Sequence, residues 1–560
     1  MNPKTADQPA SVAVAPPART LVLLCGGLAE LGNGLDLTGI ERSLQENTPE
    51  SRLEVVADLC DNSKALAEAA GEGDDRAVLG LCSGDRSRQE IDYRARQAGL
   101  DPFGVATVNL GALCALAHPG DLATGKAIVL LAAAVAKARA FPGSGPEHMK
   151  PRLGWSDGRV SRRALFTLPP VTYQPVASVR ADRCMSEAGC DLCTAVCPRN
   201  ALSVVRGKLN VDKSACDACG LCITACPRNA VELPAASLRE FEVELEALLT
   251  APGLQPSDPR AILYVCDGNL PLLGELSKDG HSYAAGWLPL RVPCAGMVSP
   301  GWILQSLALG ASAVGIIACG GDCEFGQQER TAATVAYCHD LLELLGVSRD
   351  KLRVLEPSSV TDMADVLNRP FEDGSVHTNS ALERACLKEP SATASALLHL
   401  DEASDGAVPV ALRHDLSPLG VVHIDAQGCT GCESCARACP TDALTSREEA
   451  DALTITFDPN LCTGCSLCAR WCPENVISVS KVTDLHALRD GRTVLYHDTQ
   501  AHCERCGVAF APASMVRRVE QLLQGGGATS QAIRRCPSCR GFAVGASLDG
   551  HVQSDHRKEK

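Results

Sequence analysis

Over residues 20–140, short apolar runs alternate with longer polar or alanine-rich segments. TLVLLC, LEVVADLC and RAVLGLC are short and apolar, as buried strands are, and polar or alanine-rich segments of crossover length separate them. This alternation predicts an α/β domain with a parallel sheet. Each strand-like run ends in a cysteine, namely Cys25, Cys60 and Cys82. Because the carboxyl ends of parallel strands meet at one sheet edge, we expect these thiols to emerge together.

The same pattern returns over residues 259–357 and predicts a second parallel-sheet α/β domain. AILYVC and AVGIIAC read as strands that end in Cys266 and Cys319, while WILQSLALG and TAATVAYCHDLLELLG read as helices. An amphipathic helix is predicted just before this domain, at about residues 235–250.

Cysteine dominates the remaining chemistry, with 30 cysteines among 560 residues. The chain starts without the apolar core of an export signal, and its best membrane candidate, AIVLLAAAVA, is shorter than the roughly 20 residues that a span needs. We therefore predict a cytoplasmic protein without a membrane span, whose clustered, reduced thiols bind metal. The net charge of −15 argues against a nucleic-acid partner.

An internal repeat carries the clearest metal motif. CDLCTAVCPRNAL and CDACGLCITACPRNAV recur later as CTGCESCARACPTDAL and CTGCSLCARWCPENVI. The run C-x2-C-x2-C-x3-C-P is typical of bacterial ferredoxins, in which the fourth cysteine ligates the other cluster of a pair. In the later pair it predicts one 4Fe–4S cluster on Cys429, Cys432, Cys435 and Cys472 and another on Cys462, Cys465, Cys468 and Cys439.

The earlier pair has one regular and one modified copy, because five residues separate Cys184 from Cys190 where the motif has two. We still assign one 4Fe–4S cluster to Cys184, Cys190, Cys193 and Cys226 and another to Cys216, Cys219, Cys222 and Cys197. The alternatives for both pairs are zinc sites or cysteines without metal.

Residues 20–140 resemble the amino-terminal domain of the A subunit of heterodisulfide reductase, through LCGG, CSGDRSRQEIDYRARQAGLDPF and NLGALCALAHPGDLATGKAIVLLAAAVAKAR. The resemblance implies a 4Fe–4S cluster on Cys25, Cys60, Cys82 and Cys114, whereas spacing alone also allows buried structural cysteines. That family carries a flavin domain, but this sequence lacks a G-x-G-x-x-G fingerprint after a strand. We therefore do not expect this chain to bind flavin.

Residues 261–355 resemble the delta (iron–sulfur) subunit of methyl-viologen-reducing hydrogenase, through AILYVCDGN, RVPCAGMVSP, GASAVGIIACGGDCEFGQQ and LLGVSRDKLRV. The resemblance implies a 2Fe–2S cluster on Cys266, Cys294, Cys319 and Cys323. The family often has a further cysteine shortly after the first, and CDGN lacks it. A redox dithiol or a structural role for Cys319 and Cys323 is the alternative, although dithiol chemistry favours the shorter C-x-x-C spacing.

Two CxxC pairs near the carboxyl end, CERC and CPSC, read as a zinc ribbon on Cys503, Cys506, Cys536 and Cys539, with rubredoxin-like iron as the alternative. Seven groups of four leave two of the 30 cysteines, Cys338 and Cys386, outside any predicted site. We expect Cys338 to lie in a helix core. We interpret His118, His281 and His502, which lie near cysteines, as ordinary histidines.

The predicted fold class is multidomain α/β and α+β, in which two parallel-sheet α/β domains alternate with two ferredoxin-like dicluster domains before a zinc-ribbon-like module. The expected segments are a disordered tail (1–19), the first α/β domain (20–140), a linker (141–182), the first dicluster domain (183–232), a connecting helix (233–258), the hydrogenase-delta-like domain (259–357), a helical and irregular linker (358–420), the second dicluster domain (421–482), the zinc-ribbon-like module (483–550) and a charged tail (551–560).

These features favour an electron-transfer subunit over a stand-alone catalyst, because the sequence has no adjacent cysteine pair, Walker loop, G-x-S-x-G or H-E-x-x-H motif. The expected partners are a hydrogenase or formate dehydrogenase catalytic subunit, other redox subunits or ferredoxin. One alternative is a subunit of a heterodisulfide-reductase-like or flavin-based bifurcating oxidoreductase with thiol/disulfide chemistry. Another is a non-redox scaffold or zinc-ribbon regulator.

Overall fold

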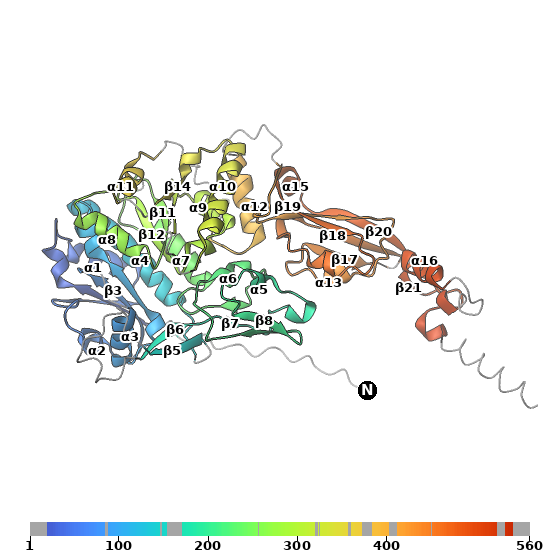
Figure 1. Cartoon of the computed structure of the whole chain (residues 1–560), viewed down its shortest axis with the longest axis horizontal. Helices are drawn as coiled ribbons and strands as arrows, with labels where there is room; N and C mark the ends of the chain where they lie inside the picture. The colour runs from blue at the N-terminus through green and yellow to red at the C-terminus, as the bar shows by residue number, and fades with distance from the viewer. Residues whose placement is uncertain are drawn as a thin grey trace, which may run out of the picture.

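The computed structural model describes residues 19–83, 88–145, 148–153, 171–255, 257–319, 323, 325–356, 360–371, 384–402, 411–449, 451–523 and 532–540. Two α/β domains lie side by side at one end of the molecule, and the first cysteine-rich domain lies against them (Figure 1). The second cysteine-rich domain and the carboxyl-terminal segment extend away from this group (Figure 1). The architecture is therefore a mixture of parallel α/β sheets and ferredoxin-type domains.

The first α/β domain has a four-stranded parallel sheet of order β2-β1-β3-β4. Its strands are β1 (Arg19–Cys25), β2 (Ser51–Val56), β3 (Asp74–Leu81) and β4 (Val105–Asn109). Its helices are α1 (Leu37–Asn47), α2 (Ala65–Ala69), α3 (Arg88–Gln97) and α4 (Gly120–Ala140). The strand expected to end at Cys60 ends at Val56, so Cys60 lies in the turn beyond it.

The stretch expected to be a linker, residues 141–182, contains strands. β5 (Met149–Leu153) pairs antiparallel with β6 (Val171–Pro175), and the guanidinium of Arg96 lies 4.2 Å from the ring centre of Tyr173. This cation–π contact fixes β6 against α3. Residues 154–170 lie outside the described part of the chain.

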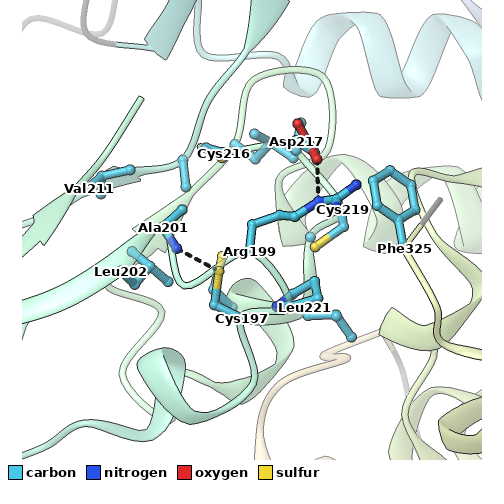
Figure 2. A pocket seen from close by; sticks show the side chains of 16 residues that line it. Cys197, Arg199, Ala201, Leu202, Val211, Cys216, Asp217, Cys219, Leu221 and Phe325 are labelled. Carbon is cyan, nitrogen blue, oxygen red and sulfur yellow. Dashed lines mark hydrogen bonds and ion pairs between the residues drawn. The ribbon is translucent and has the colours of Figure 1, made fainter. Parts of the chain in front are cut away.

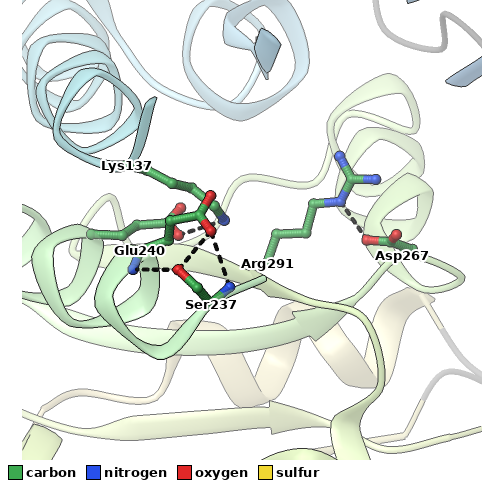
Figure 3. Close-up of polar contacts among 6 residues, drawn as sticks. Lys137, Ser237, Glu240, Asp267 and Arg291 are labelled. Atoms are coloured by element: carbon green, nitrogen blue, oxygen red, sulfur yellow. Dashed lines mark hydrogen bonds and ion pairs between the residues drawn. The ribbon is translucent and has the colours of Figure 1, made fainter. Parts of the chain in front are cut away.

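The two ends of the first cysteine-rich domain are joined by a short antiparallel pair of strands, β7 (Ser178–Val179) and β10 (Val231–Glu232). Between these strands lie the one-turn helices α5 (Leu192–Ala195) and α6 (Leu221–Ala225) and the hairpin of β8 (Leu202–Val205) and β9 (Lys208–Val211). The helix that follows, α7 (Leu238–Thr250), begins after a capping box between Ser237 and Glu240, a few residues later than the predicted start near residue 235 (Figure 3).

The second α/β domain has a four-stranded parallel sheet of order β12-β11-β13-β14. Its strands are β11 (Ala261–Cys266), β12 (Trp287–Val292), β13 (Val314–Ile317) and β14 (Leu352–Leu355). Its helices are α8 (Leu270–Lys278), α9 (Pro300–Ala308), α10 (Gln328–Leu344), α11 (Val360–Asn368) and α12 (Pro390–Glu402). Trp287, Trp302 and Tyr264 are fully buried in its core.

The two α/β domains are joined through α4 and α7. Lys137 on α4 forms an ion pair with Glu244 on α7, with 2.7 Å between Nζ and Oε2. Gly125 on α4 approaches the loop after α7 so closely that a Cβ there would lie 2.2 Å from the Gly253 carbonyl oxygen. Only glycine fits this crossing, so the two domains pack as one unit.

In the second cysteine-rich domain, β19 (Ile477–Asp484) pairs antiparallel with β16 (Gly420–Ile424) and β15 (Ala411–Arg413). Its helices are α13 (Ser434–Arg437), α14 (Leu467–Arg470) and α15 (Leu485–Asp490). A second sheet joins β17 (Leu444–Glu448), β18 (Ala452–Phe457), β20 (Thr493–His502) and β21 (Ala509–Pro512), and α16 (Ala513–Leu522) follows. Because β20 pairs with β18, this sheet crosses the boundary expected at residue 482.

Among the helices in the described ranges, none combines the length and apolar character needed to cross a membrane.

Candidate metal centres

Three thiols of the first α/β domain meet at the carboxyl edge of its sheet. The sulfur atoms of Cys25, Cys60 and Cys82 all lie within 4.8 Å of one another. The Sγ of Cys82 lies 3.2 Å from that of Cys25 and 3.4 Å from that of Cys60. Burial, followed by the two neighbouring thiols, raises the pKa of Cys82 to about 12. A bound cation would relieve this crowding of potential negative charges.

Cys114, the fourth residue predicted for this site, is not part of the close group. It lies fully buried in the π-helical turn Gly111–Ala115 that follows β4, and burial raises its pKa to about 12. The turn is pressed against the end of β3, because a Cβ on Gly111 would lie 1.9 Å from the Cys82 carbonyl oxygen. The described structure thus gathers three of the four predicted thiols and holds the fourth on an adjacent turn.

Arg94 stabilises the turn that carries Cys60, a role that the sequence does not predict. Its side chain is 1% exposed and donates hydrogen bonds to the carbonyl oxygens of Leu59 at 2.8 Å and Cys60 at 3.1 Å. It also pairs with Glu90 at 2.5 Å. An arginine within a polar helix gives no sequence signal for this role, because its carbonyl partners lie on a turn more than 30 residues away.

The first cysteine-rich domain brings Cys184, the residue before the irregular loop, to the other predicted ligands. The pKa of Cys193 is raised to about 12 by burial and then by the charges of Cys226, Cys190 and Cys184. The chain returns through a 3-10 turn over Ser186–Ala188 and a left-handed Gly189 with φ +78°. The insertion is therefore absorbed in a turn, and the four thiols gather as the spacing predicts.

The second predicted group in this domain lines one cavity. Cys197, Cys216, Cys219 and Cys222 border it, and Phe325 from the second α/β domain closes one side (Figure 2). The backbone N–H of Ala201 donates to the Cys197 sulfur at 3.3 Å. Arg199 pairs with Asp217 at 2.6 Å beside the cavity (Figure 2). The lining therefore supplies four sulfurs and a backbone donor, a set that suits an iron–sulfur cluster.

The second cysteine-rich domain repeats this arrangement. Its first cavity is lined by Cys429, Cys432, Cys435 and Cys472. In the other group, the pKa of Cys468 is raised to about 12 by burial and then by the charges of Cys462, Cys465 and Cys439. The described structure thus brings the cysteines of each group near one another.

The three regular motif copies share a backbone conformation that wraps the chain around its thiols. Between the first three cysteines of each copy, φ is positive at two positions, at Ala218 and Gly220, Gly431 and Glu433, and Gly464 and Ser466. Left-handed residues turn successive N–H groups toward one side, which makes a concave site for an anionic group. At Cys462 one such N–H, from Gly464, donates to the sulfur at 3.4 Å.

The four thiols of the second α/β domain follow its strands. Cys266 ends β11, Cys294 lies just past β12, and Cys319 lies just past β13. The pKa of Cys319 is raised to about 12, chiefly by burial and then by the charges of Cys323, Cys294 and Cys266. Asp267, next to Cys266, pairs with Arg291 on β12 (Figure 3).

Cys323 is the one thiol of these four whose pKa is lowered rather than raised. Burial would raise its pKa, but backbone N–H groups of Phe325, Gln327 and Gly326 outweigh that effect, and the pKa is lowered. The pair Cys319 and Cys323 is thus one half of a four-thiol arrangement.

The carboxyl-terminal group brings all four of its predicted thiols together. The sulfurs of Cys503, Cys506, Cys536 and Cys539 all lie within 4.8 Å of one another. The pKa of Cys503 is lowered to about 6, chiefly by the backbone N–H of Cys536. Four thiolates at this spacing can close around one tetrahedral ion.

The residues left outside the predicted sites have ordinary surroundings. Cys338 is fully buried in α10, as expected, and Cys386 is half-buried. His118 lies 2.9 Å from the ammonium of Lys126, and His502 lies 3.2 Å from Asp451.

Three family models match parts of the chain. Residues 264–371 match the delta subunit of methyl-viologen-reducing hydrogenase, residues 428–476 match a 4Fe-4S dicluster domain, and residues 209–232 match a 4Fe-4S binding domain. No curated protein matches the chain. The chain is therefore a composite iron–sulfur protein, as the motifs predict, and its 4Fe–4S sites lie in two ferredoxin-type domains. None of the three matches covers residues 20–140, so the likeness to heterodisulfide reductase stays a prediction.

Proposed function

We propose that this protein is a cytoplasmic relay that carries electrons between a hydrogenase or formate-dehydrogenase-type catalytic subunit and a low-potential acceptor. One observation carries the proposal. Phe325, from the loop of the delta-subunit-like thiol group, closes the cavity lined by Cys197, Cys216, Cys219 and Cys222 of the first ferredoxin domain. A domain of the kind found in a hydrogenase complex thus adjoins a ferredoxin site, as an electron donor adjoins its acceptor.

The proposed cofactors are five 4Fe–4S clusters, one 2Fe–2S cluster and one zinc ion. Four 4Fe–4S clusters belong to the ferredoxin-type domains. The fifth would be held by Cys25, Cys60 and Cys82, with Cys114 from the adjacent turn as fourth ligand. The 2Fe–2S cluster would be held by Cys266, Cys294, Cys319 and Cys323, and zinc by Cys503, Cys506, Cys536 and Cys539. Iron–sulfur clusters supply one-electron chemistry, and the protein sets their potentials through charge, hydrogen bonds and exposure.

The delta-like domain is the proposed docking side for the catalytic subunit. Its thiol edge faces the first ferredoxin domain, and Cys323 lies half-buried with a lowered pKa. Oxygen-sensitive clusters and reduced thiols also fit a cytoplasmic setting.

Metal analysis of the full chain tests the proposal. Anaerobically purified protein should contain about 22 iron atoms and about one zinc per chain. About 16 iron atoms would mean that only the ferredoxin-type sites hold clusters, which would overturn both α/β assignments.

A single substitution tests the delta-like site. Cys323→Ser should remove the 2Fe–2S electron paramagnetic resonance signal and leave the 4Fe–4S signals in place. Cys386→Ser is the matched control, because Cys386 is a half-buried cysteine outside the predicted groups. Survival of the signal in Cys323→Ser would refute the assignment.

A further inference from the structure

The two ferredoxin domains touch through residues that adjoin their cysteines. Asp191, which follows Cys190, forms a two-pronged ion pair with Arg470, which lies two residues after Cys468. The Nη1–Oδ1 distance is 2.8 Å and the Nη2–Oδ2 distance is 3.4 Å. These residues are 279 positions apart in sequence. Such bidentate pairs fix orientation as well as contact.

Two more hydrogen bonds cross the same junction. Arg228, two residues after Cys226, donates to the carbonyl oxygen of Pro440, which follows Cys439, at 3.1 Å. The indole N–H of Trp471 donates to the carbonyl oxygen of Ala188. The contacts therefore surround two particular thiol groups.

The internal repeat shows that these contacts are specific to one face. Arg437 occupies the position of Arg470 in the other motif copy of the same domain, but it pairs with Glu433 in its own helix and is 76% exposed. Arg199 occupies the position of Arg228 and pairs with Asp217 in its own domain at 2.6 Å. Arg470 thus bridges the two ferredoxin domains, whereas the ion pair of the equivalent Arg437 stays within its own motif copy.

The other thiol group of the first ferredoxin domain lies against the delta-like domain. Gly220, between Cys219 and Cys222, has φ +81°, and a Cβ there would lie 2.8 Å from the Met297 sulfur. Phe325 closes the same site (Figure 2). The first ferredoxin domain therefore contacts both neighbours, with a different thiol group near each contact.

The geometry points to a fixed electron path that does not follow the order of the sequence. It runs from the delta-like site to the Cys197 group, then to the Cys184 group, across the Asp191–Arg470 junction to the Cys439 group, and on to the Cys429 group. At the junction one electron leaves the Cys184 group, whose cluster is oxidised, and enters the Cys439 group, whose cluster is reduced. This inference rests on the proposed relay and adds its order and its crossing point.

Magnetic coupling between reduced clusters in the full chain tests the junction. Arg470→Glu places two like charges at the ion pair and should separate the domains. We expect this variant to keep its iron. After reduction with dithionite, its electron paramagnetic resonance spectrum should lose the broadening that comes from coupling between clusters on the two sides of the junction. The double variant Asp191→Arg/Arg470→Glu restores the opposite charges and should restore the broadening. Arg437→Glu, at the equivalent exposed position, should leave the spectrum unchanged.

The iron content of each sample distinguishes a failure of the proposed relay from a failure of the proposed junction. Low iron in the unaltered protein would refute the proposed relay itself. Full iron with unchanged broadening in Arg470→Glu would overturn the junction. Arg228→Ala provides a second test, because it removes only the donor to Pro440 and leaves the Arg470 helix intact. Unchanged broadening in that variant together with Arg470→Glu would exclude this crossing point.

Discussion

Replacement of Arg94 by methionine should release the turn that carries Cys60. Arg94 is buried and donates to the carbonyl oxygens of Leu59 and Cys60 at 2.8 and 3.1 Å. Methionine fills part of the space but leaves both oxygens without this donor. Each hydrogen bond to a charged group contributes about 1.5–3 kcal/mol, so the local cost is at least about 3 kcal/mol.

Hydrogen exchange across residues 57–62 measures this cost directly, because local opening sets the exchange rate. A loss of about 3 kcal/mol should speed exchange on the order of 100-fold, since each 1.4 kcal/mol corresponds to a factor of about ten. The displaced Cys60 should also cost the variant about four iron atoms, those of the amino-terminal site. The ferredoxin signals should remain.

Arg96→Met is the matched control, because Arg96 lies on the same helix with an exposed side chain. It should keep both the slow exchange of residues 57–62 and the full iron content. If Arg94→Met also kept both, the turn would not depend on this guanidinium, and the reasoning would be refuted.

Three further substitutions probe other parts of the molecule. Ser237→Ala removes the cap of α7 and should lower the free energy of unfolding by about 1 kcal/mol in denaturant titration, and an unchanged midpoint would contradict the capping role. Burial raises the pKa of Glu242 to about 7 from its ordinary 4.5, so its favourable contribution is complete below about pH 4.5 and is lost as pH rises through about 7. Glu242→Gln should flatten the pH dependence of the unfolding midpoint in that window, and a profile like that of the unaltered protein would count against it. Lys388→Met removes a half-buried cation near Cys226 and should lower the midpoint potential of that cluster in a redox titration, whereas a higher potential would be inconsistent with the charge argument.

In the two ferredoxin-type domains, most ligands predicted for a cluster lie close together in sequence, whereas those of the two α/β domains lie 20 or more residues apart except for Cys319 and Cys323. The ferredoxin-type spacing predicts which cysteines gather, and the alternation of strands and helices predicts both parallel sheets. Even the irregular loop before Cys190 leaves Cys184 with its expected neighbours, because a short turn and Gly189 absorb the extra residues.

Contacts between domains could not be predicted in the same way. Asp191 and Arg470 are exposed polar residues with no periodic pattern, and only the folded chain brings them together across 279 positions. The pairing of β20 with β18 likewise depends on a register between segments that look independent in sequence. The strand before Cys60 ends early because the apolar run continues into a turn, and periodicity does not distinguish the two.

The number of electrons that the full chain accepts tests the relay most directly. In an anaerobic coulometric titration, five 4Fe–4S clusters and one 2Fe–2S cluster should take up about six electrons per chain. Each electron that is taken up should change the spectroscopic signal of one cluster, and no substrate should be needed. Uptake of about four electrons would confine the redox chemistry to the ferredoxin domains and would contradict a path that begins at the delta-like site.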